Sequence, residues 1–534
     1  MKFYLQSQTL LKICYAYLIL PIIIFFIGWL NLPLIFLSLS VTTIGVYFSF
    51  KKIINNESFI KLDLIFLFFS FVILFIWVGF SGIGGFGYQN YDFHFRNAVF
   101  RDLITFKWPI IYDYSGDLIL QQIIGDKGAL VYFFTFWLPS ALVGKLFGWW
   151  AANVALFIWT LIGLFLTVLL INQYIGKTTI VLVLAFIFAS GLDIVGTIGL
   201  KFIEISRIST TTNEISLRYL IGNILPIFLG NEHLEWWAGR YLFQYSSFTT
   251  QLFWVFNSSI PTWLVTLLLL NEYQKKNLLF SYAPVLFYAP FSAIGLIPFL
   301  IYKFYKLNTH HFQIRKPNFS SLKEMILDNF SFQNTVIPIV FIFVSFLFLG
   351  SQVGNHPYGL IWDFNTFSIK LILIYLSFCF LEFLLYGLFV VDIRKEKFLF
   401  FLTLGILLIL PLYKYGSHND FTMRASISWL LIFFTISFKH ISSKPGKISE
   451  KKQQVLLILL LILFLLGSVT PLHEIIRSRD EIIAAGGLPE MTDNWSSFGQ
   501  INNFGREDPE FKELIKNFIV NPENSFFFNF LSRN

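Results

Sequence analysis

The feature that most constrains this chain is a series of long apolar runs separated by short polar breaks. A helix of about 20 apolar residues is long enough to cross a bilayer. Only 13% of the 534 residues are charged and 56% are hydrophobic, whereas about 25% of the residues in a soluble domain are charged. The sequence therefore predicts an all-α polytopic membrane protein and argues against a soluble globular fold.

Eleven runs are long enough to be membrane spans, and two further runs are ambiguous. The predicted spans are residues 12–30, 33–50, 60–80, 149–172, 178–198, 251–271, 335–352, 368–392, 397–413, 424–438 and 453–472. The ambiguous runs, 128–147 and 278–302, contain prolines, and proline interrupts helical hydrogen bonding. We expect each of them to return to the side it left, the second as a re-entrant pair of half-length helices.

Basic residues gather in short clusters between the apolar runs, as at Lys51-Lys52 and Lys275-Lys276. The positive-inside bias places such clusters on the cytoplasmic side. The N-terminus is then cytoplasmic and the C-terminus lies outside. The Phe-, Ile-, Lys- and Asn-rich composition indicates an AT-rich bacterial source, and hence a bacterial plasma membrane.

This topology divides the chain into a membrane domain and a tail. The membrane domain covers residues 1–472, with a first outer loop at 81–127 and a second at 199–250. Residues 473–534 form a polar tail on the outer face. Interfacial helices are expected in the outer loops.

The first outer loop carries closely spaced charges beside a span, a placement that is usually functional in membrane proteins. Residues 92–106 are expected to form an amphipathic surface helix, with Asn90 or Asp92 as its N-cap. Asp92 and Arg96 share a helix face at i, i+4, so one interpretation is a local ion pair. The other makes Asp92 a general base at the bilayer edge, with His94 oriented beside it.

Asp193 is the second candidate acid. It lies at the expected outer end of a span, between Gly191 and Gly196. One interpretation is that it caps a following helix. The functional interpretation is that it shares a cavity with Asp92.

Residues 231–263 are rich in aromatic side chains, with Arg240 and Gln251 among them. Tryptophan and tyrosine are enriched at membrane–water interfaces, so interfacial anchoring is one interpretation. Stacked aromatics with nearby amides also suit the apolar faces and hydroxyls of sugar rings.

A later outer segment places four polar residues between two spans: Lys414, His418, Asp420 and Arg424. An arginine at the outer end of a helix can bind a phosphate at headgroup height. Ordinary snorkelling of a long cationic side chain is the alternative.

Several function classes find no support. The sequence contains neither GxxxxGK[ST], the phosphate-binding loop of an ATP-driven pump, nor HExxH or CxxC. Both cysteines lie in apolar runs, where they are expected to pack as small hydrophobes. The net charge of +8 is distributed among the connectors, so no nucleic-acid partner is expected.

Three elements together resemble the GT-C superfamily of integral-membrane glycosyltransferases. They are the acidic motif Tyr91-Asp92-Phe93-His94, the run that ends in Lys145-Leu146-Phe147-Gly148, and the second acid Asp193. The resemblance covers roughly residues 60–300. The chain departs from the family in lacking an Asp-Glu pair in the first loop and in having an extra hairpin at 12–50.

The resemblance implies a polyprenyl-phosphate-linked sugar as donor and a glycan, lipid or protein as acceptor. Asp92 acts as base with His94 and Asp193 as the other catalytic residues, and attack at the anomeric carbon expels the lipid phosphate with inversion. Six residues are then expected to bind substrate: Arg96, Arg240, Gln251, Lys414, His418 and Arg424. Whether a divalent cation assists the departing phosphate stays open.

Two other functions remain as alternatives. A polysaccharide polymerase or ligase also uses a lipid-linked sugar, but it places its key groups in a large later outer loop. A lipid or sugar carrier performs no chemistry and favours charges in the middle of spans. Here the mid-span charges are few, namely Glu382 and Lys370.

Overall fold

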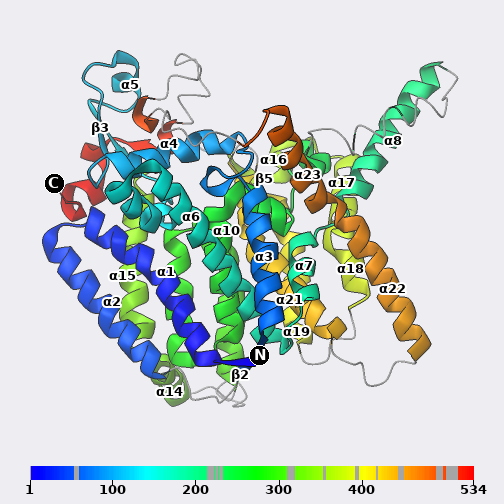
Figure 1. The fold of residues 1–534 in the computed structure, drawn as a ribbon, viewed down its shortest axis with the longest axis horizontal. Helices are drawn as coiled ribbons and strands as arrows, with labels where there is room; N and C mark the ends of the chain where they lie inside the picture. Colours follow the sequence, from blue (N-terminus) through cyan, green and yellow to red (C-terminus); the bar gives the residue numbers. More distant parts are fainter. Residues whose placement is uncertain are drawn as a thin grey trace. The chain divides into compact units, whose positions relative to one another are not determined.

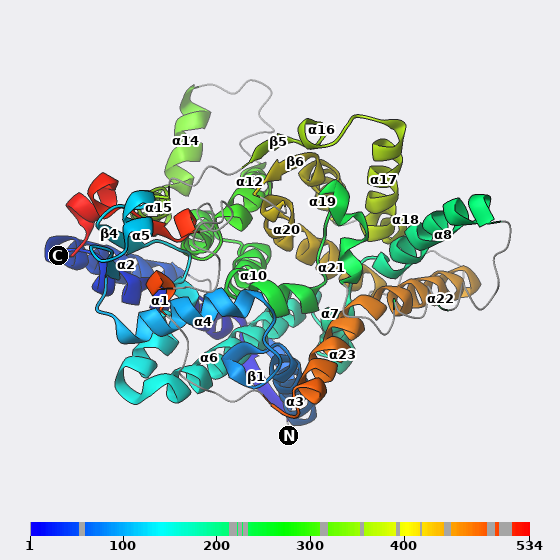
Figure 2. The same ribbon diagram turned by 90° about the horizontal axis from the view of Figure 1, so that it is seen from above.

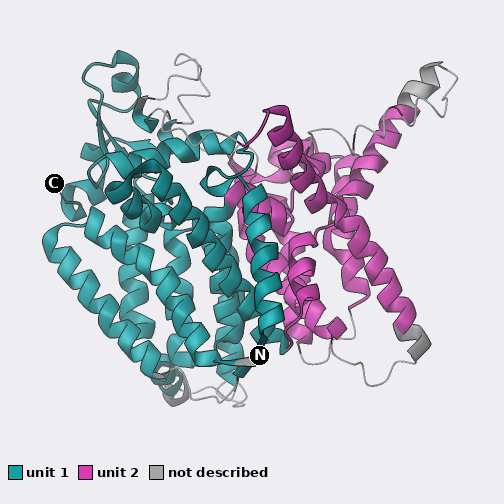
Figure 3. Cartoon of the chain, in the orientation of Figure 1, with its two compact units in different colours: residues 1–176, 256–355, 489–534 teal, residues 177–255, 356–488 magenta. Residues whose placement is uncertain are grey.

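The computed structural model divides the chain into two compact units, each made of segments that are distant in the sequence (Figure 3). Unit 1 contains residues 1–176, 256–355 and 489–534, and unit 2 contains residues 177–255 and 356–488. The structure describes residues 2–52, 59–212, 222, 227, 233–309, 319–352, 357–390, 396–416, 419–442, 450–488, 497–500 and 515–533.

Unit 1 is built mainly of long apolar helices (Figure 1). Its helices are α1 (Ser7–Trp29), α2 (Leu32–Lys52), α3 (Leu64–Phe80), α4 (Asp92–Thr105), α5 (Leu118–Ile123), α6 (Leu138–Ile175), most of α10 (Phe248–Asn271), α11 (Leu278–Tyr282), α12 (Pro290–Leu307), α14 (Phe319–Asn329) and α15 (Phe332–Leu349). Its strands are β1 (Lys2–Gln6), β2 (Phe59–Asp63), β3 (Ile111–Asp113), β4 (Lys127–Leu130) and β7 (Ile519–Val520).

Unit 2 has more interrupted helices. They are α7 (Ile180–Phe188), α8 (Asp193–Thr212), α16 (Ile361–Phe364), α17 (Ile369–Cys379), α18 (Leu385–Leu388), α19 (Lys397–Ile409), α20 (Asp420–Ala425), α21 (Ile427–Ser442), α22 (Glu450–Gly467) and α23 (Val469–Ala484), with strands β5 (Tyr358–Leu360) and β6 (Tyr413–Tyr415). Within this unit α8 packs against α22 and α23 (Figure 2).

Nine helices in the described part of the chain are long and apolar enough to cross a membrane. Each overlaps one of the predicted spans, although Thr135–Ile175 and Gln454–Ala484 extend well beyond the predicted bounds. Two shorter apolar helices, Leu64–Phe80 and Lys397–Leu412, coincide with the other two. The prediction of a helical multi-pass membrane protein is confirmed at this level, whereas the count of eleven spans stays a prediction.

The first ambiguous run does not form a straight helix. Residues 128–147 contain most of β4, a 3-10 turn at Thr135–Trp137 and the first part of α6. That part ends at Gly148, whose backbone (φ 84, ψ −177) is not helical. About ten residues rise only about 15 Å, which is half of the hydrocarbon thickness of about 30 Å.

The second ambiguous run is interrupted, as its prolines predict. Residues 278–302 form α11, a 3-10 turn at Ala283–Phe287 and then most of α12, which begins at Pro290. Pro290 fits this position because the first turn of a helix needs no hydrogen bond from its nitrogen. Whether the pair re-enters the membrane stays a prediction.

Helix α4 lies across one end of unit 1, and the N-terminus lies at the opposite end (Figure 1). The helix begins at Asp92, as predicted, but its N-cap is Tyr91, so the prediction of Asn90 or Asp92 as the N-cap was wrong. The Asn90 side chain instead accepts a hydrogen bond from the Asp92 N–H at 3.2 Å. Its inner face includes Phe93, Val99 and Leu103, all buried, and it packs on α6. The apolar face predicted for this helix therefore packs on protein.

The predicted tail is divided between the units: residues 473–488 belong to unit 2, where α23 continues to Ala484, and the later part is attached to the first loop of unit 1. Strand β7 pairs antiparallel with β4. In addition, Asp102 Oδ2 accepts hydrogen bonds from the Tyr112 hydroxyl (2.6 Å), the Ser497 hydroxyl (3.0 Å) and the Phe498 N–H (2.8 Å). Asp102 is fully buried, and this burial raises its pKa to about 6 although the three donors oppose the shift.

The raised pKa predicts that the tail is held more firmly in acid. Asp102 binds its proton below about pH 6 in the folded chain, but only below its ordinary pKa of 3.8 when unfolded. The folded state with the tail attached therefore gains stability over the unfolded chain as the pH falls through 6, and the gain of about 3 kcal/mol is complete below 3.8. Hydrogen exchange at residues 497–500, compared between the natural protein and Asp102→Asn at each pH, measures this gain.

We expect the protection of the natural protein relative to Asp102→Asn to rise between pH 8 and pH 5. Asp113→Asn is the matched control, because Asp113 is exposed and its pKa is lowered, chiefly by its hydrogen bonds with Ser115. A protection ratio that does not change with pH would contradict the prediction.

Candidate functional site

The polar side chains of unit 2 gather where membrane helices lose their regular geometry. The backbone between the end of α7 at Phe188 and the start of α8 at Asp193 is not helical. The helix over 369–388 contains a π turn at Phe380–Leu384. Non-helical backbone at membrane depth is tolerated where protein covers it, and π turns are frequent at functional sites.

The non-helical residues between α7 and α8 pack on the π turn at Phe380–Leu384. The Leu192 N–H donates to the Leu381 carbonyl at 3.1 Å, so the π turn supplies an acceptor for a backbone N–H at the break. Gly191 lies directly against Glu382, since a Cβ built on Gly191 would be 1.9 Å from Glu382 Oε2 and 2.9 Å from its Cα. Only glycine leaves room for the carboxyl group at this place.

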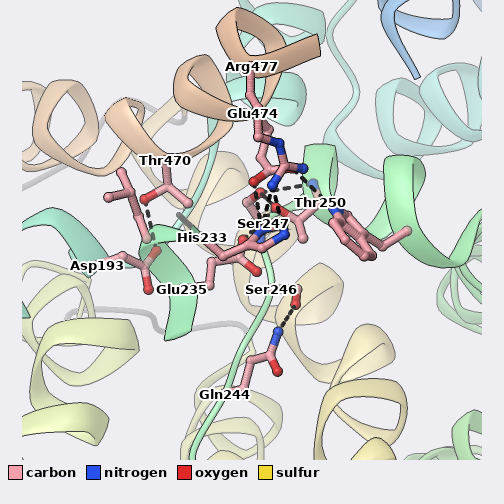
Figure 4. A network of polar contacts seen from close by, with 12 residues as sticks. Asp193, His233, Glu235, Gln244, Ser246, Ser247, Thr250, Thr470, Glu474 and Arg477 are labelled. Carbon is pink, nitrogen blue, oxygen red and sulfur yellow. Dashed lines mark hydrogen bonds and ion pairs between the residues drawn. The ribbon is translucent and has the colours of Figure 1, made fainter. Parts of the chain in front are cut away.

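Asp193 is the first residue of α8, whereas the interpretation that its side chain caps the helix stays a prediction. Asp193 Oδ2 accepts hydrogen bonds from the Ser190 hydroxyl at 3.0 Å and from the Thr470 hydroxyl at 3.0 Å (Figure 4). The carboxyl groups of Asp193 and Glu382 are close enough to interact with each other. Asp193 and Glu382 are only 1% and 6% exposed, so this is a buried pair of acids.

Glu235 is a third buried acid in the same unit, 2% exposed. Its Oε1 accepts hydrogen bonds from the Ser247 N–H (2.8 Å) and the Thr250 hydroxyl (2.6 Å). Burial raises its pKa to about 8, and the negative charges of Asp193 and Glu474 add to the shift. We call Asp193, Glu235 and Glu382 the acid centre.

A second polar group beside the acid centre is internally paired. Glu474 contacts His233 Nδ1 at 2.9 Å and accepts hydrogen bonds from Arg477 (2.6 Å) and Trp254 (3.1 Å). Arg477 Nη1 also lies 2.7 Å from His233 Nε2. Both imidazole nitrogens are therefore engaged, and the group ties the start of the 3-10 segment Leu234–Tyr241 to α23 (Figure 4).

In unit 1 the structure confirms the local ion pair predicted for α4. Arg96 Nη2 lies 2.7 Å from Asp92 Oδ2, and the two side chains are 7% and 42% exposed. The Arg96 guanidinium also packs over the rings of Phe93 and Phe256, at 5.3 and 5.7 Å. His94 is half-buried on the same helix.

Asp92 belongs to unit 1 and Asp193 to unit 2. Each unit is described on its own, so a cavity shared by the two acids stays a prediction.

The predicted substrate-binding residues of unit 2 have different environments. Arg240 is exposed and packs over Tyr241 at 5.3 Å, and Lys370 packs over the same ring at 5.7 Å. Lys414 is buried over Phe364 at 4.2 Å. His418 lies outside the described residues.

The other two predicted residues of unit 2 have partners within the protein. Arg424 lies 3.6 Å from Asp420. Gln251 is fully buried and donates a hydrogen bond to the Ser246 carbonyl at 2.7 Å. Two tryptophans of the aromatic segment, Trp237 and Trp263, are buried within the protein, so interfacial anchoring was the wrong interpretation for them.

Sequence reasoning missed most of this centre. Glu235, His233, Glu474 and Arg477 were not singled out, and Glu382 was noted only as a mid-span charge. The i, i+3 spacing of Glu474 and Arg477 was the one local signal. Among the described residues no group of three or more His, Cys, Asp or Glu side chains could hold a metal ion.

These features define a class: a helical multi-pass integral membrane protein with a buried acid centre at interrupted helices. No protein-family model matches the chain, and neither a curated protein nor a solved structure matches it. What the protein does must therefore be argued from its own residues.

The contact between Gly191 and Glu382 gives a direct test of how the centre is assembled. We expect Gly191→Ala to displace the Glu382 carboxyl group and to destabilise unit 2 by about 1–3 kcal/mol, as overpacking typically does. The thermal unfolding midpoint in detergent measures the effect.

Gly199→Ala on α8 is the matched control, because a Cβ there meets nothing within 4 Å. It should leave stability unchanged or raise it by about 0.5–1 kcal/mol. Equal effects of the two substitutions would show that Gly191 is not packed as described.

Proposed function

We propose that the protein is an inverting glycosyltransferase that moves a sugar from a polyprenyl-phosphate donor to an acceptor hydroxyl on the non-cytoplasmic side of the membrane. The observation that carries the proposal is the geometry of Asp92. It is a part-exposed carboxylate at the start of a surface helix, held by a buried arginine. The resemblance of residues 91–94, 145–148 and 193 to the GT-C superfamily supports the same assignment.

The ion pair suits Asp92 to the role of a base. Arg96 holds Oδ2 at 2.7 Å, while the side chain remains 42% exposed, which leaves the second oxygen free to accept a proton. The acceptor hydroxyl gives its proton to Asp92, and its oxygen attacks the anomeric carbon. The bond from that carbon to the phosphate oxygen breaks, and the lipid phosphate leaves with the electron pair.

The departing phosphate needs cations, and unit 2 offers a pair of them. Arg240 and Lys370 both contact the Tyr241 ring. Of the two, only Arg240 was predicted from the sequence to bind substrate. No described ion pair joins either of them to a carboxylate. Charge-assisted hydrogen bonds from such groups stabilise a phosphate, so this pair is a better candidate than Arg424, which faces Asp420 at 3.6 Å.

Replacing the base tests the mechanism. We expect Asp92→Asn to lower the rate of sugar transfer by a factor of at least about 100, the range for loss of a general base, without loss of folding. Transfer from a polyprenyl-phosphate sugar by purified protein in nanodiscs is the measurement. Asp113→Asn, an exposed carboxylate of the same loop, is the control, and normal transfer by Asp92→Asn would remove Asp92 from the mechanism.

The phosphate assignment has its own test. Arg240→Ala and Lys370→Ala should each raise the donor KM while the acceptor KM changes little, because they remove a charge that contacts only the donor. Arg424→Ala serves as the comparison. If only Arg424→Ala raised the donor KM, the phosphate-binding role would be assigned to Arg424 and not to Arg240 and Lys370.

A carrier is the second candidate, and a specific observation favours it. Interrupted helices with buried acids are typical of transporter binding sites, and Glu382 lies within such a helix beside Asp193. Purified protein in liposomes distinguishes the two functions. Movement of a lipid-linked sugar across the bilayer without a new glycosidic bond would establish the carrier and overturn the transferase.

A further inference from the structure

We propose that the acid centre of unit 2 is a proton-binding site in which Asp193 and Glu382 share one proton and Glu235 binds a second. This inference goes beyond the proposed transfer reaction and does not depend on it. It rests on how the three carboxyl groups are buried, partnered and surrounded.

The first argument is that each acid keeps one buried oxygen without a conventional donor. Among the described residues, no N–H or hydroxyl group donates to Asp193 Oδ1, Glu235 Oε2 or Glu382 Oε1. A buried polar atom without a partner costs about 1–3 kcal/mol, and more if it is charged. A proton on the carboxyl group removes the charge and supplies a donor, so it relieves this cost.

The second argument is that the carboxyl groups of Asp193 and Glu382 are close enough to interact, because Gly191, two residues before Asp193, lies against Glu382. Two ionised carboxylates have only acceptor oxygens, so a hydrogen bond between them requires that one carries a proton. Two like charges at such a distance in a buried site repel strongly. A single shared proton satisfies both conditions.

The third argument is that the nearby cation, Arg477, is already paired with Glu474. The groups that face the centre from α23 and the 3-10 segment include Thr470, Glu474, Arg477 and His233, and the tyrosines Tyr245 and Tyr386 lie near Glu382. No described ion pair includes Asp193, Glu235 or Glu382. The centre would therefore carry three negative charges if no proton were bound.

A proton fits this centre better than a metal ion. A hard cation needs several oxygen ligands converging within bonding distance, and no described group of acids and histidines has that arrangement. Burial, which already raises the pKa of Glu235 to about 8, favours the neutral form of a carboxyl group.

Proton binding is coupled to the packing of the interrupted helices. The Glu382 carboxyl group lies against Gly191, and Ser190 donates to Asp193. The proton is therefore bound where the non-helical residues between α7 and α8 pack on the π turn. A folded state that holds protons which the unfolded chain releases loses stability as the pH rises. The packing of the α7–α8 break on the π turn should therefore become less stable at alkaline pH.

Infrared spectroscopy of the protein in nanodiscs counts these protons through the C=O stretch of protonated carboxyl groups, normalised to the amide absorbance. At pH 7 we expect the double variant Asp193→Asn/Glu382→Gln to lose one protonated carboxyl relative to the natural protein. Glu235→Gln should lose one at pH 6 and none at pH 10. Glu396→Gln, whose carboxylate pairs with Lys439 at 3.2 Å, is the control and should lose none.

The outcomes are distinct. Loss of two protonated carboxyls in the double variant would show that each acid holds its own proton and would overturn the sharing. Loss of none, or a natural protein without any protonated carboxyl band at pH 7, would overturn the site. Because no step of the experiment measures sugar transfer, a failure of the proposed enzyme activity leaves this result unaffected.

Discussion

The constraint on which this structure depends is the cost of burying carboxyl groups in a chain that is mostly apolar. A charge far from water is tolerated only when a partner, a proton or an ion compensates it. In unit 2 buried carboxyl groups are compensated in two different ways. Glu474 is compensated by His233 and Arg477, whereas Asp193 and Glu382 compensate each other.

The irregular backbone follows from the same constraint. A continuous helix over 180–206 would bury its own backbone groups and offer only side chains to a partner helix. The break before Asp193 exposes the Leu192 N–H to the Leu381 carbonyl, and it lets Gly191 come close to Glu382. The π turn at Phe380–Leu384 is the complementary irregularity. One backbone hydrogen bond joins the two irregular segments, and Gly191 permits their close approach.

Hydropathy was sufficient for the positions of the membrane helices, because about 20 apolar residues in a row have few alternatives in a bilayer. The i, i+4 spacing of Asp92 and Arg96 was likewise sufficient for their ion pair. Local pattern could not reveal the π turn, since Phe380–Leu384 is as apolar as a regular helix apart from Glu382. It also could not bring His233 to Glu474, because a contact between residues so distant in the sequence leaves no periodic signal. Glu235 was not recognised as a buried acid because it lies in a tryptophan-rich segment that was interpreted as interfacial.

The account thus assigns different work to the two units. Unit 1 presents a part-exposed carboxylate on α4, and unit 2 holds protons at interrupted helices and presents Arg240 with Lys370. The most direct test of the proposed transfer of a lipid-linked sugar is an experimental structure in nanodiscs with a polyprenyl phosphate bound. The account predicts a headgroup in contact with Asp92 and with Arg240 or Lys370. A headgroup that contacts neither, or Asp92 and Asp193 on opposite leaflets, would contradict it.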